Sequence, residues 1–249
     1  PAKIAQLIIF GAKVLLVDGN YDQAFDLSIE ATHAFGWYNR NTGFNPFTTE
    51  GKKTAGFEIW EQVIRRMPAE SKPLTVFIPV GDGNIISGVH KGFKDLQALG
   101  WLEKMPRIIG VQSTRSAAVA NAFWRGDEDI QPVHAETLAD SICVDLPRDG
   151  LRAVRAATET GGTYLTVPDE DILGAIVELG RVGIFAEPAA STAYAGLVKA
   201  VEEKIIEPDD PVLVLNTGSG LKDVNAAMQV VAAAPIIEPT LDALKKELG

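Results

Sequence analysis

Residues 76–93 read VFIPVGDGNIISGVHKGF, and no other stretch of the chain is as informative. A short apolar run ends at Val80, a loop with Gly81 and Gly83 follows, and a helical pattern begins near Asn84. Glycine lets the backbone adopt positive φ and come close to a ligand. The first turn of a helix carries unpaired N–H groups and a partial positive charge. The stretch therefore predicts a strand, a glycine loop and a helix start that together form a cup for a phosphate group.

The spacing of the glycines separates this loop from two better-known phosphate loops. Gly81, Gly83 and Gly88 miss the third position of the dinucleotide-binding fingerprint, and no Gly-Lys-Ser/Thr follows that would make a Walker loop. Taken alone, the loop is equally compatible with an ordinary strand-to-helix turn. A second glycine-rich loop, at 217–220, follows the last apolar run of the chain.

Strand and helix patterns alternate along the chain. Helices are expected at 2–10, 20–34, 50–66, 84–99, 116–125, 150–160, 169–180, 189–204 and 239–249, and strands at 13–18, 74–80, 107–112, 163–167 and 211–215. This order predicts an α/β fold with an open, mostly parallel sheet that helices cover on both faces. In such sheets ligands bind outside the carboxyl ends of the strands, so both glycine loops should lie on one rim.

Apolar residues at helical spacing indicate which faces are buried. The expected inner stripe of the helix at 50–66 consists of Phe57, Trp60, Val63 and Ile64. In the tail helix, Leu241 and Leu244 should face inward. Four aromatic residues near the polar stretch at 39–43 are interpreted as core or interface packing: Trp37, Tyr38, Phe44 and Phe47.

The overall composition narrows the class of protein. Among 249 residues, 46% are hydrophobic, and the formal net charge is −10, which argues against nucleic acid or an anionic membrane as a partner. A single cysteine, Cys143, fits a reducing cytoplasm and is interpreted as packing rather than as a nucleophile. No apolar run approaches the roughly 18 residues needed to cross a bilayer. His33, His90 and His134 lack the spacing of a zinc site or a catalytic triad, so no metal is expected.

The two glycine loops and three further segments carry a family resemblance. The segments are the opening at 3–22, Asn45-Pro46-Phe47-Thr48-Thr49-Glu50-Gly51-Lys52-Lys53-Thr54, and Glu187-Pro188-Ala189-Ala190-Ser191, and the second loop extends as Asn216-Thr217-Gly218-Ser219-Gly220-Leu221-Lys222-Asp223. In order and spacing they resemble the threonine-synthase branch of the fold type II (tryptophan synthase β-like) pyridoxal-phosphate enzymes, to about residue 230. The resemblance implies pyridoxal 5′-phosphate as cofactor and a small amino acid as substrate.

The resemblance also implies roles for individual residues. The segment Gly81-Asp82-Gly83-Asn84 matches the loop that holds the cofactor phosphate, and Thr217 matches the hydroxyl residue that faces the pyridine nitrogen. A neutral hydroxyl cannot keep that nitrogen protonated as an aspartate would, which favours β- or γ-elimination and replacement over transamination. Glu187 matches a glutamate near the site and is a possible catalytic residue, although an acid beside Pro188 at a helix start is an equal interpretation.

The family's Schiff-base lysine motif, Ser/Thr-x-Lys-Asp, does not occur in the sequence. Lys52, Lys53 and Lys222 are poor substitutes, because such a lysine needs a desolvated pocket, and the first two are interpreted as part of a helix start and domain hinge. We therefore expect an N-terminally incomplete chain that is inactive alone. It would hold a remnant of the small domain at 1–42 and the large cofactor-binding domain at 43–249, and it would form a homodimer or associate with the missing part.

The substrate is less determined than the cofactor. Threonine synthases have an arginine that grips the substrate phosphate where this chain has Thr48, although Arg40 could reach the same place. The resemblance implies a lyase, with conversion of O-phosphohomoserine to threonine as one reaction. The alternatives are a dehydratase or ammonia-lyase acting on a hydroxy- or diamino-acid, or a non-catalytic module that binds the cofactor or another anion. Cysteine-synthase-type replacement is disfavoured by the segment at 45–54.

Overall fold

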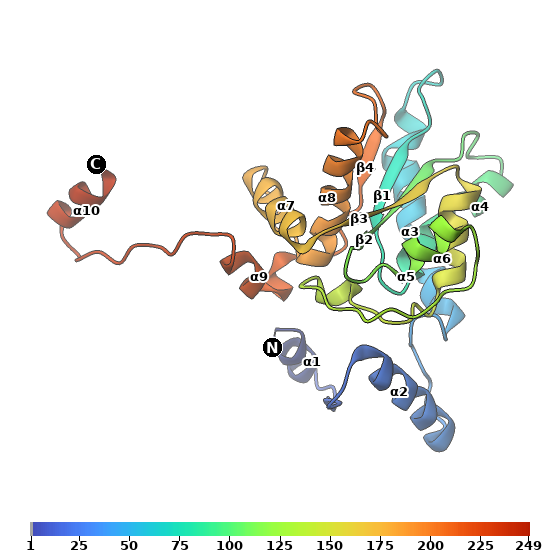
Figure 1. Cartoon of the computed structure of the whole chain (residues 1–249), viewed down its shortest axis with the longest axis horizontal. Coiled ribbons are helices and arrows are strands. Elements are labelled where there is room, and N and C mark those ends of the chain that lie inside the picture. Colours follow the sequence, from blue (N-terminus) through green and yellow to red (C-terminus); the bar gives the residue numbers. More distant parts are fainter. Residues whose placement is uncertain (1) are drawn as a thin grey trace.

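A four-stranded parallel sheet forms the centre of the computed structural model, which describes residues 2–249 (Figure 1). The strands are β1 (Thr75–Pro79), β2 (Arg107–Ser113), β3 (Thr163–Val167) and β4 (Val212–Val214), in the spatial order β3-β2-β1-β4. In register, Thr75 pairs with Arg107 on one side and with Val212 on the other. The predicted α/β architecture with a mostly parallel sheet is confirmed.

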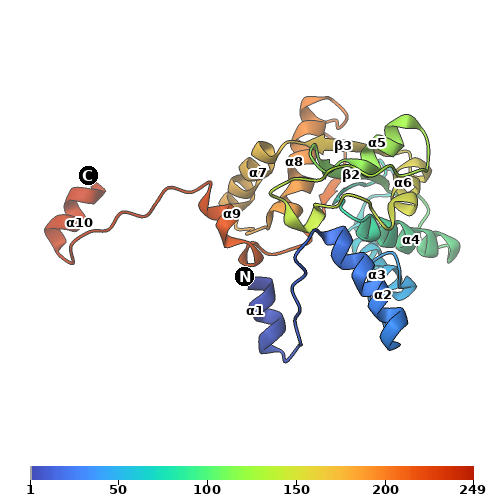
Figure 2. The same ribbon diagram turned by 60° about the horizontal axis from the view of Figure 1, so that its bottom comes forward.

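Helices cover both faces of the sheet (Figures 1 and 2). One layer contains α3 (Pro46–Gln62), α4 (Asn84–Ala98), α5 (Ala118–Arg125) and α6 (Gly150–Glu159), and the other contains α7 (Asp169–Arg181) and α8 (Pro188–Glu202). Because successive side chains of a strand point to opposite faces, Val76 and Ile78 pack with the first layer, and Phe77 packs with the second. All of β1 is buried, as expected for a central parallel strand.

Glycines bring α3 and α4 into close contact. A Cβ atom on Gly56 would lie 2.9 Å from the carbonyl oxygen of Val89, and one on Gly88 would lie 2.6 Å from the Cβ atom of Lys52. Neither contact leaves room for a side chain, since real Cβ atoms do not approach other atoms so closely. This packing fixes the middle of α3 against the first turns of α4, where the glycine loop ends.

The remaining helices lie outside the sheet and its two helix layers, which together are called the body below. α1 (Ala2–Ile9) and α2 (Tyr21–Phe35) precede α3, and α9 (Val224–Met228) and α10 (Leu241–Leu248) follow β4. Three short 3₁₀ turns occur at 64–66, 140–142 and 220–222. α10 stands away from the body at the end of an extended segment (Figure 1). No helix within residues 2–249 is long and apolar enough to span a membrane.

The strand predicted at 13–18 is wrong. This segment is not assigned to a strand, and Leu15 and Leu16 are largely exposed. An apolar run becomes a strand only where a neighbouring strand pairs with its backbone. The four strands of the sheet in the described residues are formed by other segments of the chain, and none of them pairs with residues 13–18.

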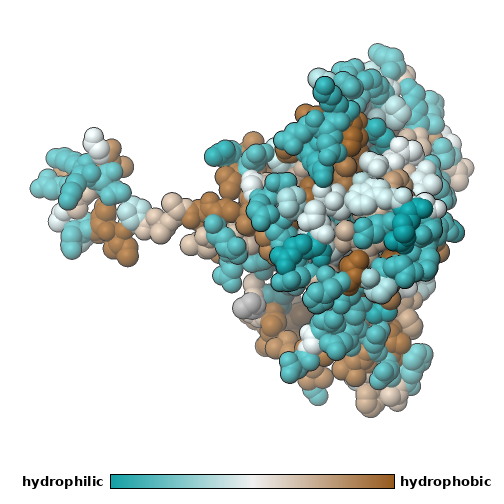
Figure 3. Space-filling model, viewed as in Figure 1, coloured by the Kyte–Doolittle hydropathy of each residue, from teal (hydrophilic) through white to brown (hydrophobic). Residues whose placement is uncertain are grey.

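The prediction that the tail helix turns its apolar residues inward is also wrong. Leu241 and Leu244 of α10 are exposed, and apolar side chains are visible on this helix in Figure 3. Trp37, Tyr38, Phe44 and Phe47 are exposed as well, so the expectation that they pack in the core is wrong, whereas their packing in an interface stays a prediction. The predicted stripe on α3 does contact the core, and the most buried apolar residue of that helix is Ile59.

Candidate active site

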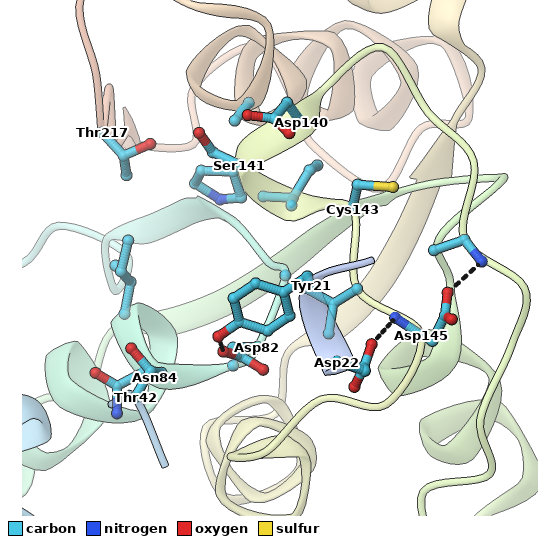
Figure 4. Close-up of a pocket in the computed structure, with 18 of the residues that line it drawn as sticks. Tyr21, Asp22, Thr42, Asp82, Asn84, Asp140, Ser141, Cys143, Asp145 and Thr217 are labelled. Carbon is cyan, nitrogen blue, oxygen red and sulfur yellow. Dashed lines mark hydrogen bonds between the residues drawn. The ribbon is translucent and has the colours of Figure 1, made fainter. Parts of the chain in front are cut away.

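A cavity of about 680 Å³ opens at the carboxyl end of β1 (Figure 4). The glycine loop 81–84 forms one wall, Glu187 and Thr217 form another, and segment 140–145 forms a third. α2 adds Tyr21 and Asp22. The two glycine-rich loops that lie far apart in the sequence therefore line one cavity on one rim of the sheet.

The start of α4 offers a row of free backbone donors. Gly83 caps this helix with φ +89°, and no side chain caps it. The first backbone hydrogen bond of the helix runs from Ser87 N to Gly83 O at 3.1 Å. Within residues 2–249, no acceptor pairs with the N–H groups of residues 81–86. Such a run of unpaired N–H groups at a helix start is suited to bind an anion.

The two glycines of the loop are required by the protein itself. A Cβ atom on Gly81 would lie 2.8 Å from the Cα atom of Ile142. One on Gly83 would lie 2.8 Å from both the Cβ atom of Ala153 and the carbonyl oxygen of Asp149. The loop is thus packed against the segment that leads into α6, and a hydrogen bond from Asp149 N to Asp82 O (2.9 Å) adds to this contact.

The Asp82 carboxylate is held by donors from two neighbouring segments. The Tyr21 hydroxyl donates to Oδ2 at 2.5 Å, and both residues are seen in Figure 4. The backbone N–H of Arg148 donates to Oδ1 at 3.0 Å. Burial raises the pKa of Asp82 and also that of Tyr21. Both carboxylate oxygens of Asp82 are hydrogen-bonded within the protein, so the group that Asp82 can offer to a ligand is its backbone N–H.

Asn84, the last residue of the loop, is fixed from three sides. Its Nδ2 donates to Thr49 Oγ1 at 2.6 Å and to Asp149 Oδ2 at 2.8 Å, and its Oδ1 accepts a hydrogen bond from Lys52 Nζ at 2.5 Å. Lys52 lines the cavity, and burial lowers its pKa against the opposing effect of the Asp149 and Asp82 carboxylates. From the sequence alone, Lys52 is interpreted as part of a helix start. No local pattern marks this contact, because Lys52 and Asn84 lie 32 positions apart in the sequence.

Glu187 and Lys222 form an ion pair between the second loop and α8. Lys222 Nζ lies 2.6 Å from Glu187 Oε1, and the Glu187 side chain is almost fully buried. Glu187 N also donates to Gly218 O at 3.1 Å. A Cβ atom on Gly218 would meet the Glu187 carboxylate and the Lys222 ammonium group, so a larger residue there would displace this ion pair. The pair therefore anchors the loop that carries Thr217.

Two residues predicted for the substrate do not line the cavity. Arg40 and Thr48 are absent from its wall, and the Thr48 hydroxyl donates a long bond of 3.5 Å to the carbonyl oxygen of Arg40. Other residues line the cavity without having been predicted to do so: Tyr21, Asp22, Ser141, Cys143 and Asp145. Segment 140–145 carries no motif, so only the fold reveals its position.

Comparison with known proteins identifies the family. A family model described as pyridoxal-phosphate dependent enzyme matches residues 1–218. Threonine synthase of Methanocaldococcus jannaschii is 36% identical over 248 residues, which cover 99% of this chain and 60% of that protein. Threonine synthase of Mycobacterium bovis is 31% identical over 249 residues, with 99% of this chain and 65% of that protein covered. The chain thus spans 60 to 65% of the length of these two relatives.

Solved structures share the fold at lower sequence identity. Diaminopropionate ammonia lyase from Escherichia coli has a TM-score of 0.73 and 18% identity, covering 92% of this chain and 60% of that chain. Threonine deaminase isoform 2 from Solanum lycopersicum, in its processed form, has a TM-score of 0.69 and 22% identity, covering 92% of this chain and 62% of that chain. The architecture is that of fold type II pyridoxal-phosphate enzymes.

The residues of the cavity fit that cofactor. The free N–H groups of residues 81–86 suit its phosphate, and the Thr217 side chain, which carries a neutral hydroxyl, lies in the opposite wall. The volume of about 680 Å³ lies within the range of sites for ligands of this size. The family match over residues 1–218 and the cavity agree, and the chain belongs to the pyridoxal-phosphate-dependent enzymes.

Proposed function

We propose that this chain forms the cofactor-phosphate wall of a threonine-synthase-like lyase that acts on a small amino acid. The observation that carries the proposal is the run of N–H groups at residues 81–86, which have no acceptor in the described part of the chain and border the cavity. Buried backbone donors are almost always paired in a folded protein, so these groups are available to a ligand. A phosphate group at a helix start satisfies several of them at once.

Thr217 and Glu187 have separate roles in this proposal. The Thr217 hydroxyl would hydrogen-bond the ring nitrogen of the cofactor, and the ion pair of Glu187 with Lys222 would keep that loop in place. When bound, the cofactor supplies an electron sink for negative charge at the substrate's α-carbon. A neutral hydroxyl weakens this sink compared with a carboxylate, which supports elimination or replacement over transamination.

The reaction itself has two candidates. The relatives named threonine synthase support γ-elimination and replacement on O-phosphohomoserine. A dehydratase or ammonia-lyase reaction is supported by one observation, the neutral Thr48 at the position where the family resemblance places an arginine. The two candidates differ in whether the substrate carries a negative charge beyond its carboxylate.

We further propose that none of the cavity-lining lysines is the covalent partner of the cofactor. Lys3 Nζ pairs with Asp140 at 2.8 Å, and Lys222 pairs with Glu187. Lys52 is hydrogen-bonded to Asn84 at the phosphate cup. The function of this chain in catalysis would then be to bind and orient the cofactor.

Equilibrium dialysis with pyridoxal phosphate, followed by borohydride reduction and peptide mass mapping, tests both parts. We expect saturable binding of one cofactor per chain with no stoichiometric adduct on a lysine of this chain. Absence of binding would contradict the proposed function. A stoichiometric adduct on one lysine would support the function and overturn the assignment of the lysines.

A further inference from the structure

We infer that Asp149 is a positioning residue of the phosphate cup, which fixes the conformation in which the loop 81–84 presents its N–H groups. Asp149 does not line the cavity, whereas Asn84, which its carboxylate holds, belongs to the cavity wall. This inference rests on the function proposed above and deepens it, because it names a residue outside the cavity on which the affinity for the cofactor phosphate depends.

The loop needs such a restraint because its own backbone is permissive. Two of its four residues are glycines, Gly81 and Gly83, and Gly83 has φ +89°. Glycine restricts the backbone less than any other residue, so the loop by itself specifies its conformation poorly. The N–H groups of residues 81–86 can bind one phosphate group together only when the loop is held in a single conformation.

Asp149 touches the loop at Asp82, Gly83 and Asn84. Its backbone N–H donates to the carbonyl oxygen of Asp82 at 2.9 Å, and its own carbonyl oxygen would lie 2.8 Å from a Cβ atom on Gly83. Its Oδ2 accepts a hydrogen bond from Asn84 Nδ2 at 2.8 Å. The first two contacts involve the backbone of Asp149, so only the third depends on its side chain.

The carboxylate of Asp149 does not cap its own helix. Asp149 is the residue before α6, where an aspartate side chain usually accepts a hydrogen bond from an N–H group of the first helical turn. No such bond forms at this helix. Instead, Oδ1 accepts from Arg152 Nε at 2.5 Å, and Oδ2 accepts from Asn84. A residue that served only to start α6 would cap it, so the orientation of the carboxylate indicates a function at the loop.

The position of this carboxylate is also unfavourable for an anion site. The Asp149 side chain is 3% exposed, and burial of a carboxylate costs free energy. A negative charge near a bound phosphate opposes binding, and the ion pair with Arg152 offsets that charge. Attraction of the ligand therefore does not explain Asp149, and its hydrogen bond with Asn84 does.

Asn84 transmits the position of Asp149 to the cavity. Its Nδ2 donates to Thr49 Oγ1 at 2.6 Å as well as to Asp149 Oδ2, so both amide hydrogens are bonded. Thr49 and Asp149 are both buried, so water does not compete for these bonds. Because the Asn84 side chain cannot rotate, the backbone N–H of the same residue is held in place at the start of α4.

Equilibrium dialysis of the purified chain with pyridoxal phosphate tests the inference. Asp149→Ser keeps a residue that starts helices well but is too short to reach Asn84. It should weaken cofactor binding roughly tenfold, or about 1.4 kcal/mol, which is the order of a hydrogen bond to a charged group. Asp149→Asn keeps an oxygen for Asn84 Nδ2 and should restore most of the affinity. Asp95→Ala is the matched control, since this carboxylate of α4 bonds Lys53 and Lys91 outside the cavity, and it should leave the affinity unchanged.

A second pair of variants shows whether Asp149 acts through Asn84. Asn84→Ala removes the amide that the carboxylate holds and should itself weaken cofactor binding. In that background Asp149→Ser should cause no further loss, because no side chain is left to orient. Equal losses from Asp149→Ser in both backgrounds would overturn the inference, and so would equal affinities of the unaltered protein and Asp149→Ser. Urea unfolding without cofactor shows which variants are folded, and if Asp149→Ser is not, an unchanged affinity of Asn84→Ala overturns the inference.

These outcomes separate the inference from the function on which it rests. If the unaltered protein binds no pyridoxal phosphate, the proposed function fails, and the inference fails with it. If the cofactor binds and Asp149→Ser binds it equally well, the inference alone fails.

Discussion

The Tyr21 hydroxyl donates a hydrogen bond to Asp82 Oδ2 at 2.5 Å and thereby joins α2 to the loop before α4. Arg148 strengthens this junction, because its guanidinium lies 3.0 Å from Asp22 and 4.5 Å from the centre of the Phe25 ring. No residue of α2 is fully buried, so this helix is held on the body by polar contacts and cation–π contact rather than by a core.

Tyr21→Phe should loosen α2. Removing the hydroxyl costs about 1 kcal/mol, the typical net value of a hydrogen bond, which corresponds to roughly fivefold faster amide hydrogen exchange in α2. Tyr38→Phe is the control, since Tyr38 is exposed and its hydroxyl has no partner among the described residues. Equal exchange in Tyr21→Phe and the unaltered protein would show that the Asp82 contact does not hold the helix.

Gly83→Ala should destabilise the loop for two reasons. The positive φ costs a residue with a Cβ atom roughly 1–2 kcal/mol, and the contact with Ala153 and Asp149 adds about 1–3 kcal/mol of overpacking. Gly100→Ala is the control, because Gly100 has φ +72° and open space around it, so it incurs only the first cost. Urea unfolding of both variants gives the difference, and equal losses would contradict the packing described for the loop.

Lys222→Met should be costly because it leaves the buried Glu187 carboxylate without its partner. A fully buried pair loses about 3–5 kcal/mol in this way, and we expect about 2 kcal/mol because Lys222 is 36% exposed. Lys3→Met removes a lysine from an exposed pair and should cost less than about 0.5 kcal/mol. If thermal unfolding shifts equally for both variants, the burial of Glu187 does not determine the stability of the second loop.

The surroundings of His90 predict that the free energy of unfolding falls in acid. Its side chain is buried, Nε2 has no hydrogen-bond partner in the described residues, and the Glu159 carboxylate is 3.5 Å away. Burial lowers its pKa, with Lys94 acting in the same direction and Glu159 opposing it. With a folded-state pKa below the unfolded value of about 6.5, the stability contributed by neutral His90 is lost as pH falls from that value toward the folded-state pKa.

Measuring the free energy of unfolding between pH 7 and 5 checks this effect. His90→Gln should flatten the acid limb of the stability curve, whereas His134→Gln, at an exposed position, should leave the limb unchanged. Parallel curves for His90→Gln and the unaltered protein would rule out His90 as the cause.

Local patterns predicted the fold well where neighbouring residues decide the structure. The strand at 163–167 and the glycine loop followed by a helix from Asn84 were predicted at the residues where they occur. The segment 13–18 failed for a physical reason, because a strand depends on a pairing partner that the segment itself does not specify. The helix at 241–248 was predicted, but its exposure was not, since an apolar stripe does not reveal whether a surface is available to cover it.

The candidate site was predictable only in part. Gly81 to Asn84 and Thr217 stand in recognisable loops, and the structure brings them to one cavity. The contact of Lys52 with Asn84 spans 32 positions of sequence and depends on the close packing of α3 and α4 at Gly88. The contact of Tyr21 with Asp82 spans 61 positions and depends on how α2 returns to the rim. Neither pair has a signature in the sequence.

Phosphorus NMR of pyridoxal phosphate added to the purified chain shows whether residues 81–86 bind the cofactor phosphate. We expect a separate resonance for bound phosphate with the unaltered protein and with Gly100→Ala, and its loss or strong weakening with Gly83→Ala, which disturbs the cup. If the unaltered protein gives no bound resonance, or if Gly83→Ala binds as well as the unaltered protein, residues 81–86 do not hold the cofactor phosphate.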